Sequence, residues 1–165
     1  MADLEVVVAG GGNAALCAAI TAREKGAAVT LFESAPENMR GGNTRHTRNL
    51  RASHAEPLET LEDSYTEDEF WDDILKVTHG NTDETLTRLM IRQSPLLLSW
   101  LKARDVHFQP ALSGTLSLHR TNAFFLGGGK TLLNKLYSHA EKIGVSVLYD
   151  SEVTSVSISN NRAHS

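Results

Sequence analysis

Three small residues and one acid near the N-terminus have the types and spacing of a dinucleotide site. Gly10, Gly12 and Ala15 match the pattern G-x-G-x-x-G/A, and Glu33 follows 18 residues after Ala15. The first glycine of this pattern permits a tight turn, the second lets a pyrophosphate approach the backbone, and the third small residue lets a helix pack on a strand. The unpaired N–H groups at the start of that helix bind the pyrophosphate. An acid at the position of Glu33 accepts hydrogen bonds from ribose hydroxyls and repels a 2′-phosphate, which favours FAD or NAD over NADP.

The residues around this pattern predict the elements that position it. Residues 4–9 form a short apolar run, which is typical of a strand buried on both faces of a parallel sheet. Residues 13–25 predict a helix that ends at a C-cap glycine, Gly26, and residues 28–32 predict a second strand. The alternative is a glycine turn that only reverses the chain. It would not explain why the glycine pattern, the helix, the second strand and the acid occur together, so we favour nucleotide binding.

Residues 34–57 contain no regular periodicity and carry several cationic or titratable side chains. Irregular stretches of this length are uncommon in compact domains, where they are usually functional or disordered. The stretch is neither repetitive nor poor in apolar residues, so we interpret it as a functional loop. Among its cationic and titratable side chains are those of Arg45, His46, Arg48, Arg51 and His54.

The arginines of this loop, together with Arg120, form a candidate anion-binding cluster. A guanidinium group can bind a carboxylate through two parallel hydrogen bonds, and several of them attract a polycarboxylate electrostatically. Loop arginines are more often solvated, and a loop histidine such as His46 is at least as often bonded to backbone. Both interpretations of these side chains therefore stay open.

Two amphipathic helices are predicted after the loop. Thr66 and Glu69 form a capping box for a helix that ends near residue 77. A second helix begins near residues 81–83, and Pro95 should kink it or split it in two. The aromatic residues at helical spacing in this region indicate core packing.

Short strands and one further helix are predicted in the rest of the chain. The strands are expected at residues 106–109, 116–120, 145–149 and 152–159. The helix at residues 130–143 should end at Gly144, and Asn160 and Asn161 predict a turn into a hairpin partner.

Three consecutive glycines, Gly127, Gly128 and Gly129, precede that helix. They invite a P-loop interpretation, but Phe124 stands where G-x-x-x-x-G-K-[ST] requires its first glycine. A triphosphate site is therefore not predicted. The glycines fit a turn where the backbone passes close to a flat ligand.

Composition and charge bound the class of protein. The 165 residues suffice for one domain with a substantial core, and the net charge of −4 gives no reason to expect nucleic acid. The lone Cys17 lies on an apolar helix, so we interpret it as a core thiol that agrees with a reducing cytoplasm. No apolar run approaches the ~18 residues of a membrane span, and residues 1–5 contain no signal peptide. No metal site is predicted.

Four segments carry longer motifs: residues 10–19, 40–51 (RGGNTRHTRNLR), 67–71 and 120–130. Together they resemble the flavoprotein superfamily of fumarate reductase and succinate dehydrogenase. The resemblance is most specific to its FAD-dependent tricarballylate dehydrogenase branch, which also includes the flavin-containing precorrin-3B synthases. It implies an α/β fold: a Rossmann-like FAD-binding domain with a parallel sheet, helices and a helical insertion, incomplete at the C-terminus. Residues 34–57 would be a cofactor loop and residues 58–104 the insertion, within a domain that spans residues 1–165.

The resemblance implies an oxidoreductase that dehydrogenates, or reduces, a CH–CH bond of a small carboxylate such as tricarballylate, with a separate electron acceptor. The catalytic acid or base of the family lies in a cap domain that is absent from this chain, so no catalytic residue is assigned and the isolated fragment is expected to be inactive. Two alternatives stay open: a non-catalytic nucleotide-binding fragment that needs a partner or the missing C-terminal half, and an NAD-binding Rossmann domain. The loop at residues 40–51 argues against NAD, because a two-strand NAD half-site does not require it. A homo-oligomer is also left open.

The resemblance assigns cofactor contacts to particular residues. The pyrophosphate is expected at Gly10, Gly12, Asn13, Ala14 and Ala15, and the ribose at Glu33 and Ser34. Other cofactor contacts are expected at Gly41, Gly42, Asn43 and Thr44 along the pyrophosphate and ribityl chain, at Gly127, Gly128 and Gly129 by the isoalloxazine, and at the backbone of Val153 by the adenine. Substrate contacts are assigned to Arg45, His46, Arg48 and Arg120. Covalent members have a histidine at the place of Asn43, so the FAD is expected to be bound non-covalently.

Overall fold

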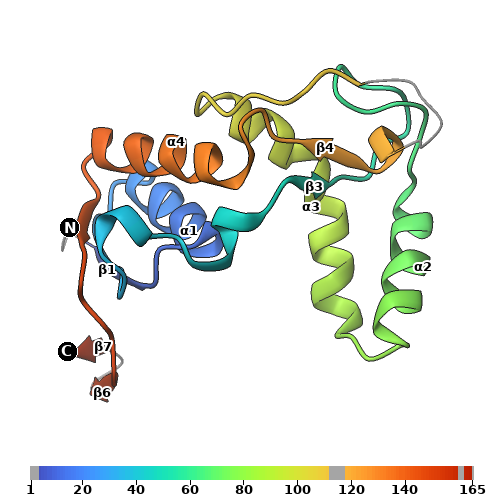
Figure 1. Ribbon diagram of the computed structural model, residues 1–165. Coiled ribbons are helices and arrows are strands. Elements are labelled where there is room, and N and C mark those ends of the chain that lie inside the picture. Colours follow the sequence, from blue (N-terminus) through green and yellow to red (C-terminus); the bar gives the residue numbers. More distant parts are fainter. Residues whose placement is uncertain (1–3, 112–117, 160–161, 165) are drawn as a thin grey trace. The chain divides into compact units, whose positions relative to one another are not determined.

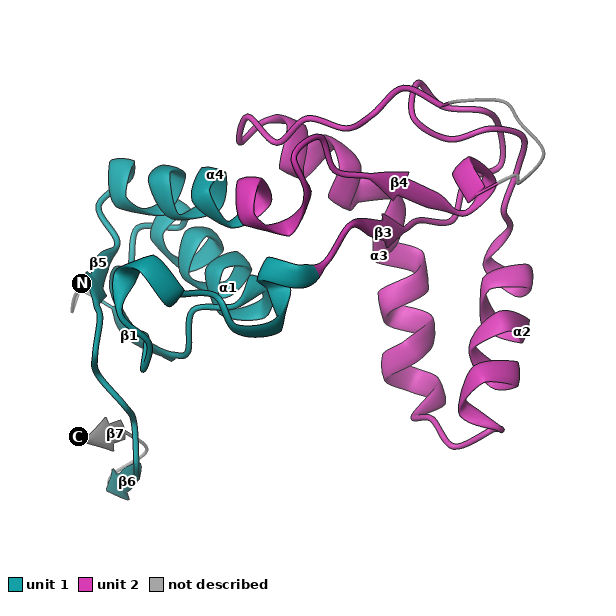
Figure 2. Cartoon of the chain, in the orientation of Figure 1, with its two compact units in different colours: residues 1–46, 133–165 teal, residues 47–132 magenta. Residues whose placement is uncertain are grey.

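The computed structural model describes residues 4–111, 118–159 and 162–164. The chain divides into two compact units, of which unit 1 comprises residues 1–46 and 133–165 and unit 2 comprises residues 47–132 (Figure 2). Helix α4 (Gly128–Lys142) begins in unit 2 and continues in unit 1. The predicted helical insertion, residues 58–104, lies within unit 2. Among the described residues, no helix is both long and apolar enough to cross a membrane.

A three-stranded parallel sheet forms the centre of unit 1. Its strands, in spatial order, are β1 (Glu5–Ala9), β2 (Ala28–Phe32) and β5 (Ser146–Leu148). Helix α1 (Asn13–Glu24) connects β1 to β2 and packs against both, and α4 leads into β5 (Figure 1). Gly26, with a φ of 91°, has the left-handed conformation that ends many helices. The predicted order of strand, helix and strand at the N-terminus is therefore confirmed.

The sheet of unit 1 is buried on only one face, which corrects the prediction for residues 4–9. Val8, Val29 and Leu31 are at most 9% exposed, whereas Val7 is 58% exposed. Successive side chains of a strand point to opposite faces, so the buried and exposed valines mark the two faces of the sheet. Within the described residues β1 pairs only with β2 and thus lies at an edge. The apolar run marks a strand correctly, but not a strand buried on both faces.

The loop predicted at residues 34–57 contains short regular elements. Two 3₁₀ helices, Glu37–Met39 and Gly42–His46, lie in the part that belongs to unit 1. Strand β3 (Asn49–Arg51), which the sequence did not predict, lies in the part that belongs to unit 2. The loop is therefore largely ordered by local turns and by pairing with a distant strand.

A hairpin follows the sheet of unit 1. Strand β6 (Ser157–Ser159) pairs antiparallel with β7 (Arg162–His164), as the turn signal predicts. The strand expected at residues 152–159 is shortened to β6, because the residues before it have no pairing partner among the described residues. The turn itself, Asn160 and Asn161, lies outside the described residues.

Unit 2 consists of a helical hairpin and a two-stranded antiparallel ladder. Helices α2 (Glu67–Thr78) and α3 (Glu84–Lys102) pack against each other (Figure 1). Strand β3 pairs with β4 (Asn122–Phe124). The two predicted helices are confirmed, and buried side chains between them include Phe70 and Ile91.

Two other predicted strands of this unit do not form in the described residues. Residues 106–109 make only an isolated bridge, between Phe108 and Phe125. The strand expected at residues 116–120 is a 3₁₀ helix over Leu118–Arg120, and its first two residues lie outside the described residues. Alternation in a short run does not supply the partner strand that its backbone N–H and C=O groups need.

The sequence predicted that Pro95 would kink this helix or split it in two, and since helix α3 is continuous through Pro95, the split does not occur. A proline inside a helix lacks an N–H and leaves the carbonyl oxygen four residues earlier without its partner. That oxygen belongs to Ile91, and it accepts hydrogen bonds from Ser94 Oγ at 2.7 Å and Ser53 Oγ at 3.2 Å. Two hydroxyl groups thus replace the missing backbone donor and stabilise the continuous helix.

All three tyrosines of the chain have a raised pKa. Tyr65 in unit 2 is 1% exposed and donates a hydrogen bond of 2.9 Å to Asp73 Oδ2; burial, followed by this bond, raises its pKa to about 12. In unit 1, burial raises the pKa of Tyr137, with a smaller contribution from the nearby carboxylate of Glu33. Burial also raises the pKa of Tyr149. The folded chain therefore favours the protonated form of every phenol.

Replacing Thr66 by Ala should lower the free energy of unfolding by about 1 kcal/mol. Thr66 Oγ1 accepts from the Glu69 N–H at 3.2 Å and Glu69 Oε2 accepts from the Thr66 N–H at 3.0 Å, so Thr66→Ala breaks the capping box of α2. Urea unfolding followed by circular dichroism measures the change. The control, Thr85→Ala at an exposed position of α3, should stay within about 0.5 kcal/mol of the parent, and equal losses in both variants would contradict the capping role.

An alkaline titration should show less tyrosinate in the folded chain than in the unfolded chain at about pH 10, where free tyrosine is half ionised. Since the folded pKa values are raised, their contribution to stability is fully present below about pH 10 and is lost as the pH rises through the folded values, about 12 for Tyr65. Ultraviolet absorbance, recorded in native buffer and in denaturant, measures the difference. Coincident titration curves in the two solvents would contradict the prediction.

Candidate functional site

The glycine turn of unit 1 joins β1 to the start of α1. Gly10 has a φ of 98°, and its N–H donates to the carbonyl oxygen of Phe32 at 2.7 Å. A Cβ atom on Gly10 would meet nothing within 4 Å, so the space beside the turn is open. Gly12 is the N-cap of α1, and without a side chain it offers no capping bond. The turn therefore presents a helix N-terminus to open space, where an anion can bind.

Glu33 lies at the end of β2, as the sequence predicts, and its carboxylate is 5% exposed. Glu33 Oε1 accepts from the N–H of Ala35 at 2.9 Å and from Ser34 Oγ at 3.4 Å. Glu33 Oε2 accepts from the N–H of Gly41 at 3.3 Å. The acid thus connects the end of the strand to two points of the following loop.

The same loop also contacts the start of α1. Thr44 Oγ1 accepts a hydrogen bond of 3.2 Å from the N–H of Asn13, and the N–H of Thr44 donates to the carbonyl oxygen of Gly41 at 3.2 Å. Gly41 has a φ of 96°, and a Cβ there would lie 2.3 Å from Leu133 Cδ1, so only glycine fits. The glycine turn, Glu33 and residues 41–44 are therefore brought together within unit 1.

One polar atom at this place has no partner. Asn13 Oδ1 is buried and accepts no hydrogen bond from any described residue. An orphaned buried acceptor costs free energy unless a further group donates to it, and a hydroxyl-bearing ligand is such a group. The open space at Gly10, the acid Glu33 and this free acceptor fit a ligand with phosphates and sugar hydroxyls.

The remaining cofactor positions predicted in unit 1 are mostly at the surface. Val153 is 38% exposed and lies in a segment without regular structure, rather than in a strand. The other exposed cofactor positions are Ala14, Ser34, Gly42 and Asn43, and the predicted substrate residue His46 is exposed as well. These residues are accessible to a ligand, but the described contacts do not fix their roles.

The structure does not assemble the predicted arginine cluster within one unit. Arg45 belongs to unit 1, where its Nη1 donates to the carbonyl oxygen of Asn38 at 2.9 Å. The other three arginines belong to unit 2. Among the described residues, Arg48 is exposed and forms no ion pair.

Two arginines of unit 2 are already neutralised by carboxylates. Arg51 forms an ion pair with Asp73 at 3.3 Å. Arg120 pairs with Glu69 and lies 3.8 Å from Asp63. The backbone N–H of Thr66, followed by Arg120, holds the pKa of the Glu69 carboxyl below its usual value. These two guanidinium groups are therefore part of a structural charge network.

Gly127, Gly128 and Gly129 form a tight turn into α4 in unit 2, and the last two are the first residues of the helix. Gly127 and Gly128 have φ values of 86° and 69°. The N–H of Gly129 donates to the carbonyl oxygen of Thr47 at 2.8 Å, which ties the turn to the chain before β3. A Cβ on Gly127 would lie 2.4 Å from Thr131 Oγ1, so the turn also requires glycine for close packing.

Two polar residues of unit 1 belong to the site region although the sequence did not single them out. Tyr137 is fully buried on α4 and donates to the carbonyl oxygen of Gly11 at 2.9 Å. The Arg40 guanidinium lies 4.2 Å from the centre of the Tyr137 ring and donates to the hydroxyl of Tyr149 at 2.7 Å. The available signal was a tyrosine on the apolar face of the helix, where its hydroxyl needs a hydrogen-bond partner.

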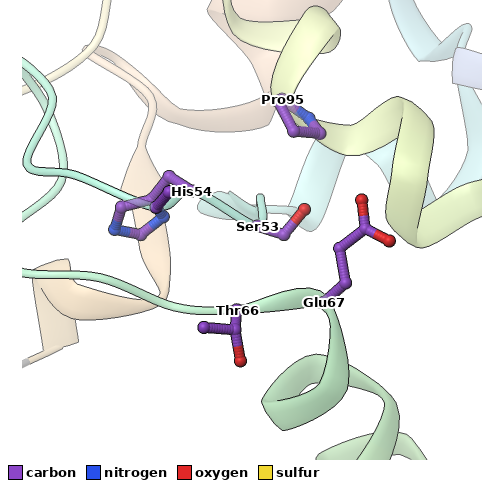
Figure 3. Close-up of a pocket in the computed structure, with 6 residues that line it drawn as sticks. Ser53, His54, Thr66, Glu67 and Pro95 are labelled. Atoms are coloured by element: carbon purple, nitrogen blue, oxygen red, sulfur yellow. The ribbon is translucent and has the colours of Figure 1, made fainter.

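Unit 2 also contains a cavity of about 240 Å³ lined by Ser53, His54, Glu67 and Pro95, among others (Figure 3). A serine, a histidine and an acid have the residue types of a nucleophilic set. Ser53 Oγ, however, donates to the carbonyl oxygen of Ile91, and the His54 ring nitrogens face the carbonyl oxygens of Ala52 and Glu62. No hydrogen bond joins Ser53, His54 and Glu67 to one another in the described residues, and the serine and the histidine are engaged by backbone carbonyl groups instead.

The sequence of the chain matches a known family over nearly its whole length. Residues 5–165 match the family described as FAD binding domain. A similar protein is the NADH:fumarate oxidoreductase of Klebsiella pneumoniae (strain 342), which is 29% identical over 163 residues. These residues are 95% of this chain and 17% of that protein, so the chain spans less than a fifth of its length.

Two solved structures share the fold. The open conformation of a flavocytochrome c3 fumarate reductase has a TM-score of 0.77 at 23% identity, over 96% of this chain and 28% of that chain. The 3-ketosteroid-Δ4-(5α)-dehydrogenase of Rhodococcus jostii RHA1 has a TM-score of 0.70 at 22% identity, over 90% of this chain and 38% of that chain. Because the family match covers almost all of the sequence, the chain belongs to the FAD binding domain family of the fumarate reductase and succinate dehydrogenase flavoprotein superfamily, and its dinucleotide is FAD.

Proposed function

We propose that the chain is the FAD-binding part of an oxidoreductase that dehydrogenates, or reduces, a CH–CH bond of a small carboxylate. The observation that carries the proposal is the meeting of the glycine turn, Glu33 and residues 41–44 through hydrogen bonds within unit 1. Helix N–H groups beside a buried acid suit a ligand with phosphates and a ribose. The chain is also similar to a protein named for fumarate.

In this proposal different residues of unit 1 bind different parts of the cofactor. The turn and the start of α1 hold the pyrophosphate, and Glu33 with Ser34 holds the ribose. Thr44 and its neighbours in the loop continue along the ribityl chain, because Thr44 is already bonded to the first N–H of α1. The roles of Gly127, Gly128, Gly129 and Val153 stay predictions.

Bound FAD supplies the group that accepts or gives up hydride. The chain's residues bind and orient this group, and no side chain described here is assigned as the acid or base. For the substrate we propose tricarballylate, because the motif at residues 40–51 resembles that branch of the superfamily, with fumarate as the alternative that the Klebsiella relative favours. Arg48 is the best candidate for a substrate carboxylate, since Arg51 and Arg120 are neutralised by acids.

A non-catalytic nucleotide-binding fragment is the second candidate. It is favoured by the share of the relative that the chain spans, 17%. A dye-coupled assay with tricarballylate and with fumarate distinguishes the two. Turnover by this chain alone would reject the non-catalytic fragment, whereas turnover only after addition of a partner polypeptide would support it.

The purified chain should be yellow, or become yellow when FAD is supplied, and acid denaturation should release all of the flavin. Release is expected because Asn43 stands where covalent members of the resembled superfamily have a histidine. Absorbance of the supernatant and of the protein pellet measures the distribution. Flavin retained in the pellet would contradict non-covalent binding, and a chain that takes up no FAD would contradict the proposed function.

Glu33→Gln should weaken FAD binding by about tenfold to a hundredfold, because hydrogen bonds to a carboxylate are replaced by bonds to a neutral amide. Titration calorimetry measures the Kd. Glu37→Gln is the matched control, since Glu37 lies on the same loop with its side chain 71% exposed, and its Kd should stay within about twofold of the parent. Equal affinities of the Glu33 variant and the parent for FAD would contradict the proposed binding of the ribose by Glu33.

A further inference from the structure

We propose that Tyr137 is a positioning residue for the pyrophosphate, which it orients through the peptide between Gly11 and Gly12. This inference rests on the proposed function, because it concerns the same FAD site. Tyr137 lies on α4, far from the glycine turn in the sequence, and donates a hydrogen bond of 2.9 Å to the carbonyl oxygen of Gly11. The bond fixes the direction of that carbonyl group.

The direction of one carbonyl sets the direction of the next N–H. The described residues contain no cis peptide bond, so the peptide between Gly11 and Gly12 is trans. In a trans peptide the C=O and the N–H point in opposite directions. When Tyr137 holds the Gly11 oxygen, the N–H of Gly12, the N-cap of α1, points away from the tyrosine. That N–H belongs to the helix terminus that receives the phosphate.

The packing around Gly11 shows that this contact is closely fitted. A Cβ on Gly11 would lie 1.9 Å from the Tyr137 hydroxyl oxygen and 2.3 Å from Glu33 Oε2. The central glycine of the turn therefore leaves room at the same place for the Tyr137 hydroxyl and for the carboxylate of Glu33, the residue proposed to bind the ribose. Gly11 does not have a positive φ, so its backbone conformation does not require glycine. The close approach of the Tyr137 hydroxyl and the Glu33 carboxylate is the reason for glycine at this position.

The Tyr137 hydroxyl is suited to act as a permanent donor. Burial raises its pKa, and the carboxylate of Glu33 adds to the shift. The phenol therefore keeps its proton at neutral pH. The phenol donates this proton to the Gly11 carbonyl, which can only accept, while the Glu33 carboxylate lies beside the same hydroxyl.

Other contacts hold α4 in place independently of this hydroxyl. Leu133 packs against Gly41, and Arg23 Nε of α1 donates to the carbonyl oxygen of Ile143 at 2.8 Å. The Tyr137 ring is fully buried, and Tyr137→Phe retains the whole ring. The substitution therefore removes the hydroxyl, with its hydrogen bond to Gly11 and its contact with Glu33, and leaves the helix packing intact.

A ligand series with the full chain tests the inference. Tyr137→Phe should weaken the binding of FAD and of ADP, which carry a pyrophosphate, by about fivefold to tenfold. Adenosine, which has the ribose and no phosphate, should compete with FAD equally well in parent and variant. Tyr149→Phe is the control: it removes a hydroxyl that contacts Arg40 and Glu141, and it should bind all three ligands like the parent.

A chain in which Tyr137 is replaced by p-aminophenylalanine should regain most of the FAD and ADP affinity, because a donor returns at the same position. Unchanged FAD and ADP affinities in Tyr137→Phe would overturn the inference. Parallel losses for adenosine and ADP would also overturn it, since they would place the effect at Glu33 or in the general fold. If Tyr137→Phe does not fold, the p-aminophenylalanine chain alone tests the inference. Weak binding of ADP together with normal binding of adenosine by that chain would overturn it. A parent chain that binds no FAD would instead contradict the proposed function.

Discussion

The buried carboxylate of Glu33 is the constraint on which the site of unit 1 depends. A charge that is 5% exposed is costly unless several hydrogen bonds compensate it. The chain after β2 supplies them by turning back, so that the N–H groups of Ala35 and Gly41 both reach the acid. This return of the loop places Thr44 against the first N–H of α1. One acid thus fixes the loop, and the loop completes the glycine turn.

Charge compensation also separates binding arginines from structural ones in unit 2. Arg51 and Arg120 lie 5.9 Å and 5.6 Å from the centre of the Tyr65 ring, and each pairs with a carboxylate. The Tyr65 hydroxyl donates to the same Asp73 that Arg51 contacts. A substrate carboxylate at either arginine would have to displace a group that is already bonded. The residue type alone, an arginine on a loop, does not contain this information.

The parts of the fold that follow from local signals were predictable from the sequence. The capping box of Thr66, the C-cap of Gly26 and the position of Glu33 each depend on residues within a few turns of chain. Strand β3 was not predictable, because β4, its partner among the described residues, lies far along the sequence. The same holds for Tyr137, whose partner is a backbone carbonyl in the glycine turn. The absence of a split at Pro95 was not predictable either, because the hydroxyls that replace its donor come partly from another segment.

The hydrogen bonds of Glu33 also limit how it can hold a ribose. A carboxylate offers about four acceptor positions, and Ala35, Ser34 and Gly41 already use three of them. The hydroxyl of Tyr137 also lies beside this carboxylate, so at most one position is free, whereas a ribose has two hydroxyl groups to donate. The bond from Ser34 is the longest of the three at 3.4 Å, and Ser34 is exposed, so it can turn to solvent when a second hydroxyl arrives. The backbone N–H groups cannot leave in this way without moving the loop. A ribose that donates both hydroxyls to Glu33 therefore displaces the Ser34 hydroxyl. The loop keeps its position, and Thr44 stays hydrogen-bonded to the start of α1.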